Sequence, residues 1–545
     1  MRNIAKLATG LTTVALAMAA TPVAAADPTI PLDPGQLPGM EAVQSLSPVV
    51  QAAAADPASA QELLLAAASQ LAGNATTPGN SAALAEAVTR FVQGGGIAMG
   101  PAAPPAAAQQ GVAIIRDAET EQLLREYVTP IFRAAGINTN AAKIILVGNR
   151  SFNAFVANGQ KIFINTGALM EAKTPNEIIG VLAHESGHIA GGHLVRLHQE
   201  LARAQIMAIA GMLVGAGAVA AQMQTSRGGG RQTQVGMDQT GMMGVLLGPQ
   251  ELVRRSLLSY QRSEEQAADR AAVKYLNATH QSAKGMLTTF ERFANDALFK
   301  TSSIDPYVLS HPLPAERISA LDQAARQSPY FDVKDSAALQ ARHDMMRAKL
   351  FGFMGDQAEI ARRYPVSDNS LPARYARAIS NYRFGRLGEA LQAIDGLIAS
   401  QARNPYFQEL KGQVLMESGR AQAALPYLRK AVAMAPGATP IAVLLGHALV
   451  GAGGGANDKE AIRVLGKATQ RDPDSSEGFQ YLAMAYDNIG DRPRSQLASA
   501  QALFVTGKYV EARTQAKRAQ DQFKQGSPGW LKADDILNYR PPKLD

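Results

Sequence analysis

Residues 174–192 have the sequence TPNEIIGVLAHESGHIAGG, and both ends of this stretch carry the signals of a helix boundary. Thr174 is predicted as the N-cap, Pro175 as the first helical residue and Glu177 as the partner of Thr174 in a capping box. The apolar residues that follow supply a buried face, and Gly191-Gly192 is typical of a helix end. We therefore predict a helix here, around which the rest of the domain is organised.

Two histidines and a glutamate lie on this predicted helix in the pattern His-Glu-x-x-His. His184 and His188 are four residues apart, so their imidazoles share one helical face and can bind a single Zn²⁺ ion. Glu185 lies about a hundred degrees further round the helix, where its carboxylate can hold a water molecule on the open side of the metal. Neutral imidazole ligands bring the pKa of zinc-bound water towards roughly 7. We predict one Zn²⁺ ion per chain, with Glu185 taking the proton of that water and returning it to the leaving amine.

The composition of the chain excludes several kinds of site and partner. A length of 545 residues has room for two or three domains. Cysteine is absent, which excludes disulfides, lipid attachment to cysteine and cysteine-ligated metals. The net charge of +7 is small for such a chain. Because no basic block with interleaved aromatic residues is present, nucleic acid is not an expected partner.

The first 26 residues have the features of an export signal. Arg2 and Lys6 give a positive start, residues 7–20 are apolar, and Ala24-Ala25-Ala26 offers a cleavage site. The apolar core is too short to span a bilayer. We therefore expect a signal peptide over residues 1–26 and an exported protein, which in a two-membrane bacterium means the periplasm.

Residues 27–112 are dominated by Ala, Pro, Gly and Gln, which leaves little to bury. We predict a mostly disordered, low-complexity leader with short helical pieces near residues 58–71 and 82–92. The alternative is an arm that binds a partner.

Ordered structure is expected from about residue 113. Residues 116–135 have helical spacing of apolar side chains. Strands are predicted at 143–147, 151–157 and 161–164, and Asn158-Gly159 between the last two predicts a hairpin. Within the second strand, Asn153, Ala154 and Phe155 are the candidates for pairing with an extended substrate by β-augmentation. The alternative is an ordinary strand of the sheet.

An apolar segment follows the histidine motif. Residues 206–221 are apolar residues and glycines, and a Gly-Arg stretch and a Met-containing piece continue to residue 247. The apolar run is shorter than the roughly 20 residues that cross a bilayer. We expect a buried helix and its loop; the alternative is a mobile flap or a segment that contacts a membrane surface.

Zinc needs a third protein ligand besides the two histidines. The longer motif with a third histidine fails, because Leu194 occupies that position and His193 is one residue away. A glutamate from a later helix is the other option. Glu265 shares a face with apolar residues and has Asp269 one turn on, but periodicity does not separate Glu265 from Glu264.

Three segments together resemble the peptidase family of HtpX and the CAAX prenyl endopeptidase: the histidine helix, residues 265–269 (EQAAD) and residues 311–317 (HPLPAER). The resemblance implies a mainly α fold with a small β-sheet, a zincin-like (gluzincin) metalloprotease domain. It implies that Glu265 is the third zinc ligand and that Asp269 orients a ligand. The strand Asn153 to Phe155 is similar to the substrate-edge strand of the family.

The same resemblance suggests roles for two later residues. His311 matches a histidine that can occupy the open zinc position as a latch in exported members. Arg317 matches an arginine placed to stabilise the oxyanion of the tetrahedral intermediate. The alternative for His311 is an ordinary core or surface histidine.

The C-terminal half has a repeat with a 34-residue period. Gly385 and Gly419 are 34 residues apart, and Gly490 fits the same register after an insertion of three residues near Gly451. This is the period of tetratricopeptide helix pairs. We predict an α-solenoid of tetratricopeptide repeats over residues 331–545, with at least four repeats, a last helix near 509–523 and a tail through Trp530. A dimerisation or purely stabilising array is the alternative.

A signal peptide, a zinc peptidase domain over residues 113–330 and a tetratricopeptide array resemble in combination the periplasmic β-barrel assembly-enhancing proteases. The leader departs from that resemblance. What it implies is an endopeptidase in the periplasm, peripheral to the outer membrane, that degrades misassembled or stalled outer-membrane proteins and assists their assembly. The repeats would dock the barrel assembly machinery or the unfolded client. The alternative is a tetratricopeptide chaperone or adaptor in which proteolysis is secondary or silent.

Overall fold

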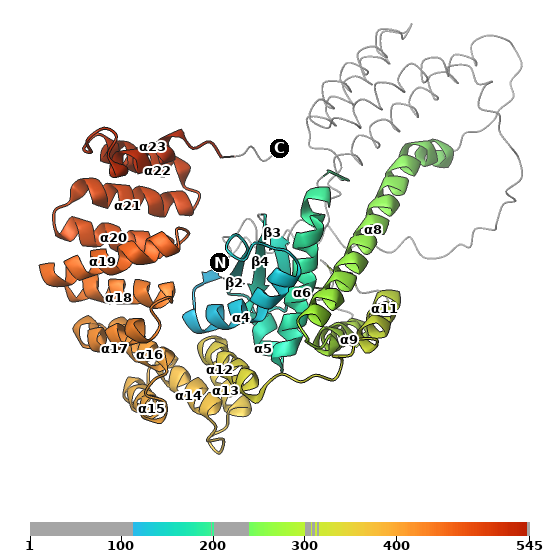
Figure 1. Ribbon diagram of the computed structural model, residues 1–545, viewed down its shortest axis with the longest axis horizontal. Coiled ribbons are helices and arrows are strands. Elements are labelled where there is room, and N and C mark those ends of the chain that lie inside the picture. Colours follow the sequence, from blue (N-terminus) through green and yellow to red (C-terminus); the bar gives the residue numbers. More distant parts are fainter. Residues whose placement is uncertain are drawn as a thin grey trace, which may run out of the picture. The chain divides into compact units, whose positions relative to one another are not determined.

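A computed structural model describes residues 113–157, 159–197, 199–200, 239–299, 307, 311–312 and 315–541 (Figure 1). The predicted signal peptide, the leader and most of the apolar segment 206–247 lie outside the described residues. No helix in the described part of the chain is long and apolar enough to span a bilayer.

The protein is mainly helical with a small mixed sheet of strand order β1-β2-β4-β3. The strands are β1 (Ile114–Ile115), β2 (Lys143–Val147), β3 (Ala154–Ala157) and β4 (Lys161–Asn165). The predicted hairpin is confirmed, since β3 pairs antiparallel with β4 and Gly159 adopts a φ of +84° in the connection. The parallel pairing of β2 with β4 and the short strand β1 were not predicted. The strand order leaves β3 at the edge of the sheet.

Seven helices of the described part accompany the sheet. They are α4 (Ala118–Ala134), α5 (Thr166–Glu171), α6 (Pro175–Gly191), α8 (Gln239–Ala278), α9 (Lys284–Phe299), α11 (Ala315–Arg326) and α12 (Ala337–Met354). The central element is α6, in which Pro175 and every residue from Glu177 to Gly187 are buried. A Cβ at Gly180 would lie 2.6 Å from the Cβ of Met286, and one at Gly187 would lie 2.9 Å from the backbone of Ala268. These two glycines therefore allow α9 and α8 to lie directly against the helix that carries the histidines.

The ends of α6 lie close to the predicted positions, but the N-terminal cap differs in detail. Thr174 is the N-cap residue, yet its hydroxyl accepts no capping hydrogen bond. The hydroxyl faces Glu177 at 3.4 Å, and Glu177 accepts instead from the backbone N–H of Lys173 at 3.1 Å. The C-cap is Gly192, with a φ of +65°, a left-handed conformation that glycine adopts without a steric penalty.

The C-terminal half consists of consecutive helix pairs, as predicted, and Figure 1 shows them stacked in chain order. The helices are α13 (Gln357–Arg363), α14 (Leu371–Arg383), α15 (Leu387–Ser400), α16 (Pro405–Glu417), α17 (Ala421–Met434), α18 (Thr439–Ala452), α19 (Gly455–Arg471), α20 (Ser476–Asn488), α21 (Arg492–Val505), α22 (Tyr509–Gln520) and α23 (Pro528–Asn538). The periodic glycines Gly385, Gly419 and Gly490 have positive φ angles between the two helices of a pair. The period therefore reflects a backbone requirement of each turn.

The end of the chain corrects one expectation. The predicted tail contains a further helix, α23, which begins with the N-cap Ser527 and with Pro528 at the first position. Ala533 and Ile536 are buried against α21 and α22. The N-cap and the burial of these two apolar side chains explain why a helix forms there.

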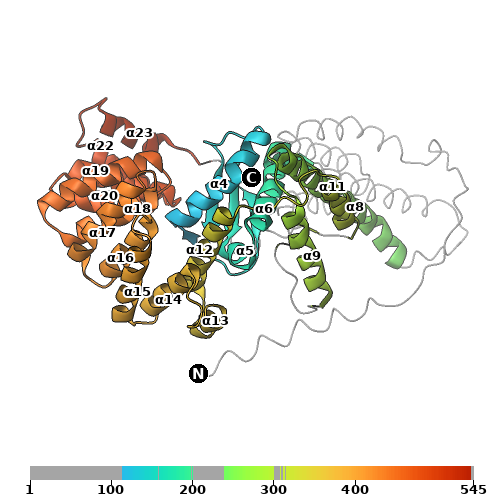
Figure 2. The ribbon, with the colours of Figure 1, turned by 60° about the horizontal axis from the view of Figure 1, so that its bottom comes forward.

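The helix α12 joins the peptidase region to the repeats (Figure 2). Its residues Met346, Leu350 and Phe351 belong to the same apolar core as α4, α6 and the sheet. On another side of α12, the buried ammonium of Lys349 pairs with Asp117, with Glu119 at 3.5 Å and with Glu409 of α16 at 3.6 Å. We call these four residues the lysine cluster. The core thus continues across the boundary that was predicted at residue 330.

Candidate active site

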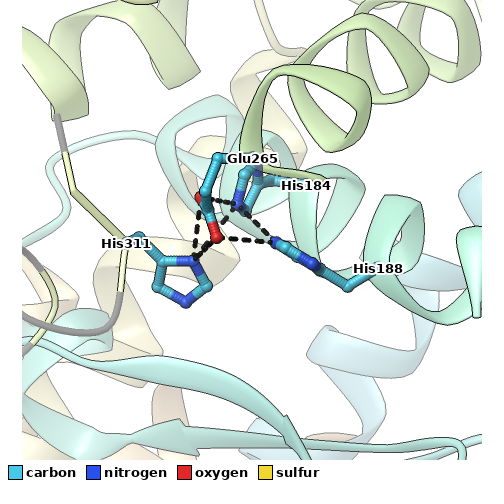
Figure 3. A group of neighbouring side chains, drawn as sticks. All are labelled: His184, His188, Glu265 and His311. Atoms are coloured by element: carbon cyan, nitrogen blue, oxygen red, sulfur yellow. Dashed lines mark hydrogen bonds and ion pairs between the residues drawn. The ribbon is translucent and has the colours of Figure 1, made fainter. Parts of the chain in front are cut away.

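Four side chains from three parts of the chain turn one ligand atom each towards a common point (Figure 3). His184 and His188 come from α6, Glu265 from α8, and His311 from the segment before α11. The ligand atoms all lie within 4.8 Å of one another. The structure thus brings together the two predicted histidine ligands, the predicted glutamate ligand and the histidine proposed as a latch.

The spacing of these atoms fits a tetrahedral metal ion. His184 Nε2 lies 3.1 Å from His188 Nε2 and 3.3 Å from Glu265 Oε2, and His188 Nε2 lies 3.4 Å from Glu265 Oε1. His311 Nδ1 lies 3.0 Å from Glu265 Oε1 and 3.4 Å from His184 Nε2. Bonds of about 2.0–2.1 Å in a tetrahedron separate zinc ligands by about 3.3 Å. The donor set is therefore arranged at the separation that zinc requires.

The orientation of the two imidazoles also fits a metal. His184 Nδ1 lies 2.9 Å from Asp269 Oδ1, and His188 Nδ1 lies 3.0 Å from His193 Nδ1. When these outward nitrogens carry the ring protons, the lone pairs of both Nε2 atoms face each other across 3.1 Å. Two lone pairs at that distance need a proton or a cation between them. A histidine that binds a metal through Nε2 needs this same tautomer, with the proton on Nδ1. The group that accepts the Nδ1–H hydrogen bond selects it.

The pKa values describe the same site without its metal. Burial lowers the pKa of His184, but hydrogen bonds with Asp269 and Glu265 overcome this and raise it to about 9. Burial holds the pKa of His188 well below its usual value. The pKa of Glu265 is well below its usual range because the nearby imidazoles, His311 foremost, outweigh the effect of burial.

Glu185 is fully buried beside this group. Neither of its carboxylate oxygens accepts a hydrogen bond from the described residues, and the nearest basic atom is His311 Nε2 at 3.5 Å. Burial raises the pKa of this carboxyl. A buried carboxylate with unused acceptor positions is suited to receive a proton from a reacting group.

Arg317 is buried among the carboxylates of the site. Its Nε and Nη2 donate to the two oxygens of Asp269, at 2.5 and 2.9 Å. Its Nη1 lies 2.7 Å from Glu265 Oε2 and donates to the carbonyl of Pro312 at 2.9 Å. The guanidinium thus holds Glu265 and Asp269 together, and Asp269 in turn contacts His184.

The edge strand β3 lies next to the metal-binding group. His311 Nε2 lies 3.3 Å from the carbonyl oxygen of Ala154, a residue with no exposed surface. The side chain of Asn153 is also buried, and Phe155 stacks on Phe163 of β4 with ring centroids 5.2 Å apart. Of the three residues predicted for substrate pairing, Ala154 and Phe155 therefore lie on the strand that His311 contacts, and Asn153 directly precedes it.

Two residues near the site had no clear sign in the sequence. Tyr307 is buried, with its ring centroid 4.7 Å from that of His311, and no motif marks it. His193, for which the failed longer motif predicted either a contact with a ligand residue or a place on the surface, is buried between His188 and Glu264. Its position one residue away from that of a third ligand was the available signal.

The fold and the site define the class of protein: a metallopeptidase domain followed by helical repeats. Residues 117–325 match the model of Peptidase family M48, and residues 415–483 match a tetratricopeptide repeat model. The chain therefore carries an M48 peptidase domain and tetratricopeptide repeats. Its His-His-Glu-His group is consistent with a zinc metalloendopeptidase.

The relatives named Beta-barrel assembly-enhancing protease match both parts. The one from Yersinia pestis is 25% identical over 419 residues, covering 75% of this chain and 81% of the relative. The one from Escherichia coli (strain K12) is 23% identical over 424 residues, with the same coverage. Metalloprotease LoiP of Escherichia coli (strain K12) is 29% identical over 209 residues, which is 38% of this chain and 71% of that protein.

Proposed function

We propose that this chain is an exported zinc metalloendopeptidase that cleaves misassembled or stalled outer-membrane proteins and assists their assembly. The observation that carries the proposal is the convergence of His184, His188 and Glu265 beside the buried carboxylate of Glu185. The names of the relatives, which match 75% of the chain, support the client class and the periplasmic location. The repeats support docking of a protein partner, either the barrel assembly machinery or the client.

His184, His188 and Glu265 would hold the zinc ion, which when bound polarises the scissile carbonyl and lowers the pKa of a water molecule. Glu185 takes the proton of the attacking water and delivers it to the leaving amine. Asp269 keeps the Nδ1 proton on His184. Arg317 holds Glu265 and Asp269 in place, and the family resemblance adds a role for Arg317 in stabilising the oxyanion.

Glu185→Gln tests the catalytic part of this proposal. The amide cannot accept the proton, so cleavage of an unfolded casein-like substrate should fall by about 10²–10⁴-fold, with one zinc ion per chain retained. In cells that lack the wild type, loss of outer-membrane protein assembly with folded Glu185→Gln protein supports the protease. Full rescue by this variant would instead favour the chaperone or adaptor. If the wild type binds one zinc ion per chain but cleaves no substrate, the metal has a structural role only.

His311 is proposed to act as a latch. Its Nδ1 lies among the ligand atoms, and its Nε2 contacts the carbonyl of Ala154. If His311 only blocks the open metal position, His311→Ala should cleave faster than the wild type. A large loss of rate would point to transition-state stabilisation, and an unchanged rate would remove His311 from the site.

An extended substrate is proposed to pair with β3 at Asn153, Ala154 and Phe155. The strand order supports this role because β3 has no neighbour on its outer side within the described sheet. Backbone pairing depends on peptide N–H groups. A peptide substrate N-methylated at the pairing positions should therefore have a raised KM, and an unchanged KM would argue against pairing.

A further inference from the structure

The two imidazoles of α6 have different partners on their outward nitrogens. His184 Nδ1 faces a carboxylate, that of Asp269, at 2.9 Å. His188 Nδ1 faces a second imidazole, that of His193, at 3.0 Å. The other nitrogen of His193, Nε2, lies 2.8 Å from Glu264 Oε2. The three side chains therefore form one line, from Glu264 through His193 to His188.

The direction of the protons along this line follows from the acceptor at its end. An ionised carboxylate only accepts, so His193 Nε2–H donates to Glu264. A neutral imidazole with its proton on Nε2 has a lone pair on Nδ1, which accepts from His188 Nδ1–H. His188 is then left with its lone pair on Nε2, the atom that faces His184 and Glu265.

We propose that His193 and Glu264 are positioning residues that fix the tautomer and ring orientation of His188 for metal binding. This inference rests on the zinc site of the proposed function. Without Glu264, His193 could place its proton on Nδ1, and two N–H groups would face each other. Without His193, the ring of His188 would be free to rotate or to change tautomer, at a cost in metal affinity.

The backbone after α6 is built for this contact. A Cβ on Gly191 would lie 2.1 Å from His193 Nε2, so the ring of His193 fits only because residue 191 is glycine. Gly192, with a φ of +65°, ends the helix and turns the chain. His193 then returns towards His188 and is only 6% exposed. His193 is one residue away from the position that a third histidine ligand would occupy in the longer motif. It thus contacts the proposed ligand His188 instead of the metal.

The helix α8 supplies both carboxylates from neighbouring positions. Adjacent residues of a helix point about a hundred degrees apart, so Glu265 faces the ligand atoms while Glu264 faces His193. Arg196 Nη2 also lies 2.9 Å from Glu264 Oε2. The uncertainty between Glu264 and Glu265 in the sequence has a physical basis, because both residues serve the same site in different shells.

The test compares His193→Leu with His193→Gln in the full chain. Leucine removes both hydrogen bonds, so zinc affinity should fall by roughly 10–100-fold. Glutamine has an acceptor and a donor side by side, so it should retain affinity within a few-fold of the wild type. Affinity is measured by competition with a chromophoric zinc chelator, and the visible spectrum of the Co²⁺-loaded protein reports ligand geometry. His447→Gln, in the repeat helix α18, is the matched histidine control, with unchanged affinity expected.

A second comparison tests the line as a unit. Glu264→Ala should weaken zinc binding, and the double variant with His193→Leu should bind no more weakly than His193→Leu alone. Additive losses of zinc affinity in the double variant would contradict the proposal that Glu264 acts through His193. So would wild-type affinity in His193→Leu, or equal losses in the leucine and glutamine variants at an unchanged melting temperature of the metal-free protein. A wild type that binds no zinc would instead overturn the proposed function, and with it the positioning role of His193 and Glu264.

Discussion

The metal-binding site and the lysine cluster contain the same number of charged groups but balance them differently. Each region places three carboxylates and one basic side chain in a largely buried space. The site has Glu185, Glu265, Asp269 and Arg317; the lysine cluster has Asp117, Glu119, Glu409 and Lys349. With all of these groups ionised, each region has an excess of two negative charges, which burial makes unfavourable.

The difference lies in the remaining neighbours. In the site, His184 and His188 turn their Nε2 atoms to the common point, so a divalent cation bound there can neutralise the excess charge. In the lysine cluster the ammonium already lies among the carboxylates, and the remaining polar neighbour of Glu119 is the hydroxyl of Tyr375. Burial raises the pKa of Glu119, and it raises that of Glu409 to about 7, so protonation of Glu409 can relieve part of the excess there. Converging imidazole lone pairs, more than buried carboxylates, mark the metal site.

The largest expected effect separates the two regions by one matched substitution in each. Glu265→Gln removes one of the three proposed zinc ligands, so peptidase activity should fall by about 10⁴-fold or more. Glu409→Gln replaces a carboxyl that is already easily protonated, so activity and zinc content should stay near those of the wild type. Initial rates on casein and zinc content per chain measure both. Similar losses of activity and zinc content in the two variants would show that the lysine cluster and the metal-binding site do not differ in function.

The next effect concerns the buried ammonium group of Lys349 in the lysine cluster. Lys349→Met leaves three carboxylates without a basic partner, and removing one side of a buried ion pair costs about 3–5 kcal/mol of unfolding free energy. Urea unfolding of the zinc-saturated protein measures the loss. The double variant with Glu409→Gln should recover part of it, because one buried charge fewer remains. A loss below about 1 kcal/mol would show that solvent reaches the lysine cluster.

The pH dependence of stability should differ between the wild type and Glu409→Gln. A glutamate has an ordinary pKa of 4.5, and burial raises that of Glu409 to about 7. Between these values the folded protein binds more protons than the unfolded chain, so stability falls as the pH rises. The contribution of Glu409 is complete below pH 4.5 and decreases by up to about 3 kcal/mol by pH 7. Unfolding free energies of both proteins across this range should diverge by that amount; parallel curves would contradict it.

The smallest effect is expected at an exposed ion pair, which serves as a reference for both buried regions. Lys143 Nζ of β2 lies 2.7 Å from Asp474 Oδ2, and their side chains are 37% and 50% exposed. Asp474→Asn should therefore change the unfolding free energy by less than about 1 kcal/mol, with the difference lost at high salt. A salt-independent loss of several kcal/mol would mean that this contact is as important as the buried ones.

Local signals predicted the local parts of the fold. The strand predicted at residues 143–147 has the same ends as β2, and the Asn-Gly turn predicted the β3–β4 hairpin. The glycine period predicted the helix pairs, because each glycine at a turn adopts a positive φ. The parallel pairing of β2 with β4 was not predictable in this way, since it depends on a crossover and leaves no signal in either strand.

The positions of the site residues were predictable only where these residues lie on the same helix. The spacing of His184 and His188 is a property of α6 alone, whereas the choice between Glu264 and Glu265 depends on how α8 lies against α6. The lysine cluster left no signal, because Glu119 and Glu409 come from helices far apart in the chain. Each of these glutamates resembles an ordinary surface residue until α12 places Lys349 between them.

The position of α12 has a consequence for the order in which the protein can fold. Tyr375 donates a hydrogen bond to Glu119, 256 residues earlier in the chain, and α12 completes the apolar core against α4. During synthesis, α4 can therefore complete its contacts only after helices much later in the chain have been made, and contacts of such long range form slowly. A chain that ends at residue 330 would expose the core surface that α12 covers, so it should aggregate, whereas the separate fragment from residue 331 onward should still fold.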